Sequence, residues 1–323
     1  MIENSQYYLV ADIGGTTSRL AIADHNNNIY ETVSKTNCDY KNLELLVKDY
    51  LAGIAVEIFP DKAVFAVACP ISGDEVELTN LDWHFSIDEL CKVFSFEYLH
   101  VINDFVALSL AVPGFTAEDY VKIGAGDALP DSPIGVIGPG TGLGMSFLVP
   151  HANGWIPVSS EGGHVSLAPG NDWEDSIISN ARKKFGHVSA ERLLSGQGLP
   201  VLYQIIAELD GQQVIELDAG EISKRDIDKS DPVATNTIDT FMGLLGSVAG
   251  DMAVTIGAKG GIYIGGGILP KLSDRFIHSG FRQRFVEKGR FRGYLEKIPT
   301  FLITRNYASL EGLRNYVNSL KGS

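Results

Sequence analysis

Apolar residues gather in short runs along the chain, and glycine-rich turns join two pairs of these runs. The first turn lies between residues 9–13 and 20–23, and the second lies between residues 134–137 and 145–149. The runs are as short as buried strands, and each turn carries a Gly-Thr pair. The pattern predicts two hairpins of strand, tight turn and strand.

The rest of the chain alternates between helical and strand-like spacing. We expect helices over residues 40–58, from Ser86, from Asn103 to Pro113, over 236–257 and near 310–320, and strands at 63–68, 98–102, 261–264 and 299–304. We expect residues 171–209 to form helices that are interrupted at Gly186, at Gly196 and at residues 198–200. The acidic residues 212–232 are expected to form a segment that leaves the core and runs over the surface. This alternation favours α/β layers with ligands bound at strand ends.

The length of the chain indicates two domains. Its 323 residues are more than a domain with a single small hydrophobic core usually contains. Pro113-Gly114 marks the expected boundary. We expect a small α/β domain of residues 1–113 with roughly 303–323, and a large α/β domain of residues 114–302.

Composition narrows the class of partner. The 26 Lys and Arg against 40 Asp and Glu give a formal net charge of −14, which disfavours nucleic acid and anionic membranes. The apolar stretch 241–258 contains an acid and several glycines and is expected to be a buried helix rather than a membrane span. Cys38, Cys69 and Cys91 form neither a redox pair nor a zinc motif, so we expect reduced thiols in the cytoplasm.

Both glycine turns suit phosphate binding. Backbone N–H groups at such a bend point into a concavity, and glycine lets a ligand approach closely. Neither turn is a Walker loop or a dinucleotide fingerprint. Two such turns predict one nucleotide held from two sides. Asp12 could hold Mg²⁺ directly or through water, or it could cap the turn; Gly265–Gly267 could lie against adenosine or merely connect a helix to a strand.

Asn103 and Asp104 lie where a strand ends and a helix begins. The helix dipole favours an ionised Asp104, which could accept a proton from a substrate hydroxyl. Helix capping alone is the alternative explanation for both residues.

Three further polar residues suit a ligand with several hydroxyl groups. Glu161 and His164 flank two glycines, and Glu191 lies at an expected helix start. A structural role is the alternative: His164 could be a structural histidine, and Glu191 could simply be an acid in the first turn of a helix. Metal binding is disfavoured because no second His or Cys lies at ligand spacing from His164.

These motifs together resemble the bacterial glucokinases of the zinc-free, proteobacterial type. The matching segments are residues 12–16, 103–105, 140–144, 161–165, 186–192 with 195–196, and 265–267. Their order and spacing hold from about residue 9 to residue 291. Two departures are Thr17, where the family often has Asn, and residues 306–312, which match the usual glycine-containing pattern only loosely.

The resemblance implies an α/β fold of two ribonuclease H-like (actin-like) domains with the active site in the cleft between them. It implies phosphorylation of glucose to glucose 6-phosphate by ATP with Mg²⁺, in a cytoplasmic homodimer. By position, Asp104 is the implied general base, and the implied sugar ligands are Asn103, Asp104, Glu161, His164 and Glu191. The implied nucleotide-binding residues are Ala11, Asp12, Ile13, Gly14, Gly15, Thr16, Gly140, Thr141, Gly142, Gly265 and Gly266. No metal site made of protein ligands alone is implied.

Two rival functions remain open at this point. One is a kinase of the same fold that acts on another hexose or an amino sugar. The other is a sugar-responsive regulator without catalysis, which the acidic charge disfavours because such regulators usually add a basic DNA-binding segment.

Overall fold

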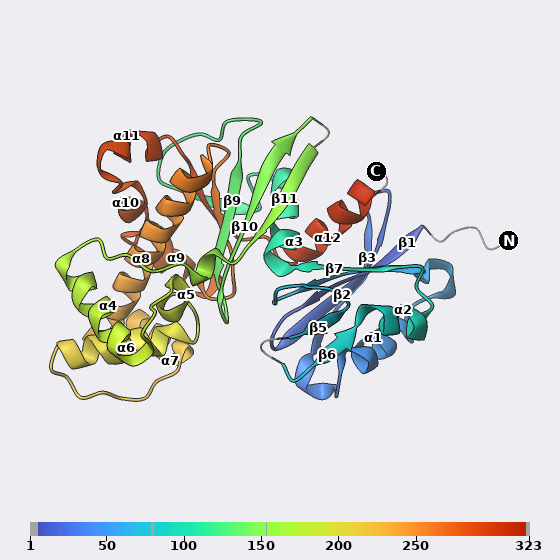
Figure 1. The fold of residues 1–323 in the computed structure, drawn as a ribbon, viewed down its shortest axis with the longest axis horizontal. Helices are drawn as coiled ribbons and strands as arrows, with labels where there is room; N and C mark the ends of the chain where they lie inside the picture. Colours follow the sequence, from blue (N-terminus) through green and yellow to red (C-terminus); the bar gives the residue numbers. More distant parts are fainter. Residues whose placement is uncertain (1–5, 79–80, 153, 321–323) are drawn as a thin grey trace. The chain divides into compact units, whose positions relative to one another are not determined.

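The computed structural model describes residues 6–78, 81–152 and 154–320, and its chain divides into two compact units (Figure 1). Unit 1 comprises the chain up to Phe115 and again from Arg305 onward, and unit 2 comprises Thr116–Thr304. Each unit has a sheet and a hydrophobic core of its own.

Unit 1 is built on a five-stranded sheet with the order β3-β2-β1-β4-β7. Its strands are β1 Tyr7–Ile13, β2 Thr17–Asp24, β3 Ile29–Thr36, β4 Lys62–Val67 and β7 Leu99–Asn103. The first three strands are antiparallel, whereas β1, β4 and β7 run parallel. A separate pair, β5 Glu75–Glu77 and β6 His84–Ser86, forms a small second sheet.

Helices cover both faces of this sheet (Figure 1). They are α1 Leu43–Leu51, α2 Ile87–Phe94, α3 Asp104–Ala111 and α12 Ala308–Ser319, with the 3₁₀ turns η1 Asn37–Asp39, η2 Val56–Ile58 and η3 Val112–Gly114. Successive side chains of a strand point to opposite faces. Leu9 and Ala11 accordingly join the core under α1 and α2, whereas Tyr8 and Val10 join the core under α3 and α12.

Unit 2 has a six-stranded sheet with the order β11-β10-β9-β12-β13-β8. Its strands are β8 Tyr120–Ile123, β9 Ile134–Pro139, β10 Leu143–His151, β11 Gly154–Ser160, β12 Ile262–Ile264 and β13 Thr300–Ile303. Parallel pairing joins β9, β12 and β13, and β9, β10 and β11 form an antiparallel meander.

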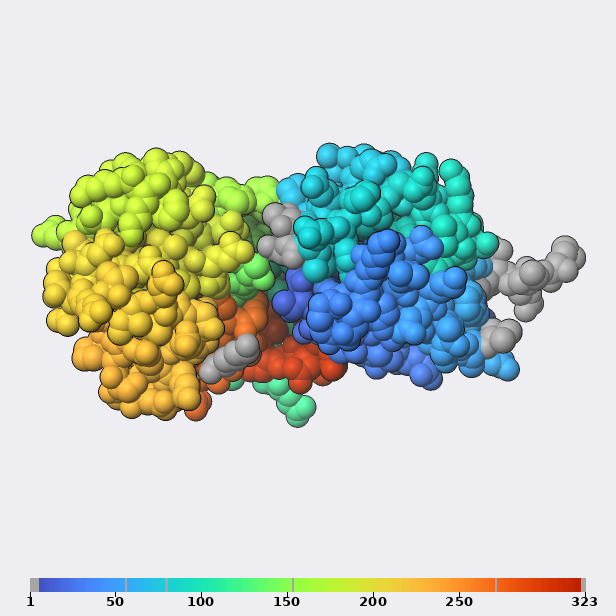
Figure 2. Space-filling model, turned by 90° about the horizontal axis from the view of Figure 1, so that it is seen from below, coloured from blue at the N-terminus to red at the C-terminus, as the bar shows by residue number. Residues whose placement is uncertain are grey.

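One large core lies between this sheet and its helices. The helices are α4 Asp172–Phe185, α5 Ala190–Leu193, α6 Gly198–Leu209, α7 Ala219–Ile227, α8 Pro232–Ile256, α9 Ser273–Ile277, α10 Phe281–Val286 and α11 Arg292–Leu295, with the 3₁₀ turns η4 Gly162–His164, η5 Leu269–Leu272 and η6 Gly289–Phe291. Helix α8 is buried along most of its length and contributes Phe241, which lies in the core with Phe281 and Phe285 of α10. The part of the chain drawn in yellow, which includes α7, forms part of the face shown in Figure 2.

Most expected elements are confirmed, including both hairpins and the α/β class. The helix expected over residues 40–58 is shorter, because Asn42 caps α1 and the helix ends at Leu51. The break expected at 198–200 is wrong, since α6 begins at Gly198 and places a proline in its first turn, where proline is tolerated.

The surface excursion expected over residues 212–232 is also wrong in part. These residues contain α7, whose N-terminus carries a reciprocal capping box between Asp218 and Glu221. Polar composition concealed this helix. Across the described ranges, every helix is too short or too polar to cross a membrane.

Candidate functional site

The first glycine turn lies at the edge of the unit 1 sheet where the three parallel strands end. Strand registers place Ile13, Val67 and Asn103 side by side at the ends of β1, β4 and β7. Residues 14–16 follow the first of these strands, and Asp104 follows the last. The sheet thus brings the expected phosphate turn and the expected general base to one edge, where ligands of α/β proteins usually bind.

A buried asparagine holds the first turn in shape. The Asn37 side chain donates from Nδ2 to the Gly14 carbonyl at 2.7 Å and accepts from Ser18 Oγ at 2.7 Å. Its backbone N–H donates to the Thr16 carbonyl at 2.9 Å. Within the described residues, the amides of Gly15 and Thr16 donate to no protein acceptor. The turn therefore has two N–H groups available to an anion.

Asp12 is a buried carboxylate at the end of β1. Its Oδ2 accepts hydrogen bonds from Ser309 Oγ at 2.9 Å and from Arg19 Nη1 at 3.3 Å. Burial raises the pKa of Asp12, while the Ser309 hydrogen bond and the Arg19 charge oppose that rise. Its Oδ1 makes no hydrogen bond with the described part of the chain. This carboxylate thus contacts β2 and α12, and it retains one oxygen for a ligand.

Asn103 and Asp104 form the start of α3. Asn103 caps the helix, because its Oδ1 accepts from the amides of Phe105 at 2.9 Å and Val106 at 3.3 Å. Asp104 Oδ1 also accepts from the Phe105 amide at 2.9 Å, and its side chain is partly exposed. The capping explanation is therefore correct for Asn103. Asp104 has the partial exposure and the helix-terminal position that a proton acceptor needs.

The second glycine turn, residues 140–142, lies at the corresponding edge of the unit 2 sheet. The Gly140 amide donates to the Gly142 carbonyl at 2.8 Å, which closes the turn. The Gly196 amide donates to the Gly140 carbonyl, also at 2.8 Å. Among described residues, the amides of Thr141 and Gly142 have no acceptor. This turn also presents two N–H groups.

Glu161, His164 and Glu191 lie together beside the second turn. Glu191 Oε2 accepts from the Leu143 amide at 2.8 Å, and its Oε1 lies 3.9 Å from His164 Nδ1. His164 Nε2 lies 3.9 Å from Glu161 Oε2. All three side chains are at least partly exposed. The cluster thus offers two carboxylates and one imidazole to a polar ligand.

Gly265 and Gly266 follow β12 and pack against the end of β9. The Gly265 amide donates to the Ile137 carbonyl at 2.9 Å. A Cβ atom on Gly138 would lie 2.6 Å from the Gly265 carbonyl carbon, and one on Gly266, where φ is +88°, would overlap the Pro139 carbonyl oxygen. Close approach of two backbones requires glycine here.

The structure groups the expected site residues by unit. Unit 1 holds Ala11, Asp12, Ile13, Gly14, Gly15, Thr16, Asn103 and Asp104. Unit 2 holds Gly140, Thr141, Gly142, Glu161, His164, Glu191, Gly265 and Gly266. Sequence patterns missed Asn37 altogether. They included Gly196 and Ser309 in family-matching segments, but they gave no sign that these two residues brace the turns. No local signal marks the contact of Ser309 with Asp12, because the two residues lie 297 positions apart in the chain.

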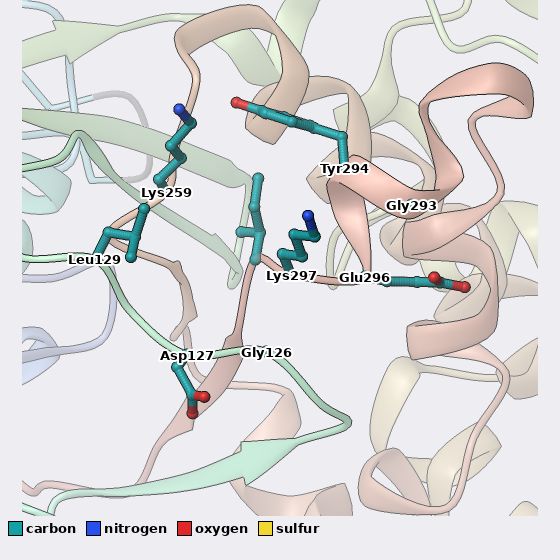
Figure 3. Close-up of a pocket in the computed structure, with 9 residues that line it drawn as sticks. Gly126, Asp127, Leu129, Lys259, Gly293, Tyr294, Glu296 and Lys297 are labelled. Atoms are coloured by element: carbon teal, nitrogen blue, oxygen red, sulfur yellow. The ribbon is translucent and has the colours of Figure 1, made fainter.

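A separate cavity of about 580 Å³ lies in unit 2 (Figure 3). Its walls include Leu129, Lys259 and Ile298, which precede β9, β12 and β13. The second glycine turn follows β9, so this cavity is at the opposite edge of the sheet. It contains none of the expected site residues.

The family model described as Glucokinase matches residues 9–320. The chain belongs to the glucokinase family. It is a hexose kinase that phosphorylates glucose with ATP, and the resemblance seen in the sequence is confirmed. The comparisons give no support to the alternative of another hexose or a non-catalytic regulator.

Relatives extend along nearly the whole chain. The glucokinase of Paramagnetospirillum magneticum is 43% identical over 320 residues, covering 99% of this chain and 100% of that protein. The glucokinase of Chromobacterium violaceum is 43% identical over 305 residues, covering 94% and 87%. The Bifunctional protein glk of Paraburkholderia xenovorans is also 43% identical, but the chain spans only 48% of its length.

Solved structures show the same fold. The glucokinase of an Antarctic psychrotroph has a TM-score of 0.86 at 40% identity, covering 98% of this chain and 99% of that one. A ROK family glucokinase from Streptomyces griseus, in complex with glucose and AMPPNP, has a TM-score of 0.63 at 18% identity and covers 96% and 98%. The expected actin-like fold is therefore confirmed for this glucokinase-family chain.

Proposed function

We propose that this kinase transfers the γ-phosphoryl group of ATP to the 6-hydroxyl of glucose, with Asp104 as the general base. The observation that carries the proposal is the pair of glycine turns, each with two backbone amides that have no acceptor among the described residues. Such amides bind phosphate oxygens and stabilise the charge that develops during transfer. Two such amides per turn suit the binding of phosphate oxygens at each turn.

Asp104 is proposed to accept the proton of the attacking hydroxyl. Its carboxylate lies at the start of α3, where the helix dipole favours the ionised form. Asn103, fixed as the helix cap, retains its side-chain NH₂ group for a sugar hydroxyl. A base in this position would take the proton as the hydroxyl oxygen bonds to phosphorus.

Glu161, His164 and Glu191 are proposed to bind the sugar hydroxyl groups. Their three side chains lie in one cluster of unit 2 and present carboxylate acceptors and an imidazole. Hydrogen bonds from buried or half-buried groups discriminate strongly between hydroxyl arrangements, because an unmatched group stays unpaired. Gly265 and Gly266, packed against β9, are proposed to form part of the adenosine site.

Asp12 suits a magnesium ion brought by ATP. Mg²⁺ is commonly bound through one or two carboxylates together with substrate phosphates and water. Asp12 supplies one carboxylate at the first turn, and its Oδ1 makes no hydrogen bond with the described residues. When bound, the ion would neutralise phosphate charge, while Ser309 and Arg19 hold the carboxylate in place.

The first test is the variant Asp104→Asn. We expect it to retain glucose binding and to lose about 10²–10⁴-fold in kcat, the usual contribution of a general base. A coupled assay of ADP release with ATP and Mg²⁺ measures turnover on glucose, mannose, fructose and N-acetylglucosamine. Near-normal turnover of the variant would remove Asp104 from this role, and turnover on a sugar other than glucose would change the proposed substrate.

We further propose that the enzyme is a cytoplasmic homodimer. The compartment is supported by its cysteines, since Cys38, Cys69 and Cys91, all within the described residues, form no disulfide. The dimer is supported by the resemblance to bacterial glucokinases alone. Light scattering coupled to gel filtration tests it, and a mass near 34.9 kDa, that of one chain, would overturn it.

A further inference from the structure

Glu191 makes contacts in two directions. Its Oε2 accepts the Leu143 amide at 2.8 Å, where β10 leaves the second glycine turn. Its Oε1 lies on the side of His164, 3.9 Å from Nδ1. One carboxylate therefore touches both the proposed phosphate turn and the proposed sugar cluster.

The segment that carries Glu191 also contacts the turn at a second point. Gly196 donates to the Gly140 carbonyl at 2.8 Å, so residues 191–196 bond to both sides of the turn. The space at Gly142 shows how tightly the carboxylate is seated. A Cβ atom on Gly142 would overlap Glu191 Oε2, whereas one on Gly140 would meet nothing nearer than the Gly267 nitrogen at 4.0 Å.

We propose that Glu191 is a positioning residue for the second phosphate turn as well as a sugar ligand. This inference rests on the proposed function and extends it. Sugar binding and triphosphate binding then share one side chain: Oε2 fixes the turn while Oε1 stays available to a sugar hydroxyl. Loss of this carboxylate weakens nucleotide binding even in the absence of sugar.

The second turn binds ATP only in the fraction of molecules in which it has the correct conformation. A hydrogen bond to a charged acceptor is among the stronger ones in proteins, and it fixes the first peptide after the turn. Without it, the turn samples other conformations, and the apparent affinity for ATP falls by the fraction of molecules that remain competent. A residue that only binds sugar has no such effect.

The experiment measures binding of AMPPNP with Mg²⁺ by calorimetry, without sugar, on the full chain. We expect Glu191→Ala to weaken AMPPNP binding about 3- to 10-fold, and Glu191→Gln to restore much of it because its carbonyl oxygen can accept the Leu143 amide. The matched control is Glu161→Ala, which removes an acid of the same cluster that makes no bond to the turn among the described residues. It is expected to leave AMPPNP affinity unchanged. Equal affinities for wild type and Glu191→Ala would overturn the inference.

A reciprocal variant tests the same coupling from the turn. Gly142→Ala pushes the Glu191 carboxylate aside, so we expect glucose affinity without nucleotide to fall about 3- to 10-fold. The control Gly140→Ala, in the same turn but with open space, is expected to leave glucose affinity unchanged. Equal glucose affinity of both variants would contradict the proposal.

Failure of this inference is distinguishable from failure of the proposed function. A wild-type chain that binds AMPPNP but does not phosphorylate glucose overturns the proposed function. The AMPPNP affinities of the variants can still be compared in that case. An active wild-type enzyme in which Glu191→Ala binds AMPPNP normally overturns only the positioning role.

Discussion

The two glycine hairpins follow one sequence plan, but different chemistry holds each in place. The turn of unit 1 is fixed by the neutral amide of Asn37, which is 1% exposed. The turn of unit 2 is fixed by the carboxylate of Glu191, whose side chain is 32% exposed. The buried Asn37 amide can only stabilise the fold, because no ligand reaches it. The partly exposed Glu191 carboxylate can also bind a ligand.

This difference separates stability from binding. Loss of a buried partner leaves polar groups unpaired inside the protein and costs free energy of unfolding. Loss of a partly exposed hydrogen-bond partner lowers the free energy of unfolding by less, because water takes its place. Changes around the first turn should therefore lower stability, and changes around the second should alter binding.

The largest stability effect is expected from Gly312→Ala in α12. A Cβ atom there would overlap the Ala107 carbonyl oxygen of α3, so the helix that carries Ser309 must shift. We expect a loss of about 3 kcal/mol in the free energy of unfolding, measured by urea denaturation. The control Gly293→Ala, in α11 with open space around it, should change stability little. Similar values for both would show that α12 tolerates the extra methyl group at its contact with α3.

A smaller loss is expected from Asn37→Ala. It leaves the Gly14 carbonyl and the Ser18 hydroxyl without their partner, which costs about 2 kcal/mol in the free energy of unfolding. Asn37→Asp keeps the acceptor for Ser18, but it places a buried carboxylate oxygen against the Gly14 carbonyl, so it should lose at least as much stability as Asn37→Ala. Glu191→Gln, measured in the same way, should lose much less. A larger loss for Glu191→Gln than for Asn37→Ala would reverse the comparison between the two turns.

The smallest of these effects is expected from Ser309→Ala. It removes one of the two hydrogen bonds to Asp12 Oδ2 and leaves Arg19, so about 1 kcal/mol of stability is lost. Because Asp12 is proposed to face Mg²⁺, KM for ATP should rise modestly while KM for glucose stays constant. Steady-state kinetics of Ser309→Ala and of Ser309→Thr, which keeps a hydroxyl, measure this. A change in KM for glucose alone would dissociate Ser309 from the first turn.

Much of the fold could be predicted because its signals are local. The first hairpin follows from two apolar runs and the glycines between them. The helix expected from Ser86 is confirmed as α2, and Ser86 is its N-cap. The capping box at the start of α7 is an equally local signal. The expectation for this polar segment rested on its composition alone, and it therefore missed the helix. The break expected near Pro200 failed because proline is compatible with the first turn of a helix.

The sequence by itself determined the strands, the two glycine turns, the family and the residue types at the site, because each depends on neighbours in the chain. Only the tertiary structure decided what braces each turn. Ser309 meets Asp12 across 297 positions, and Glu191 meets Leu143 across 48. No spacing encodes such contacts. They arise when α12 packs onto the sheet of unit 1 and when α5 packs beside β10 in unit 2, so the same glycine motif acquires an amide brace in one unit and a carboxylate brace in the other.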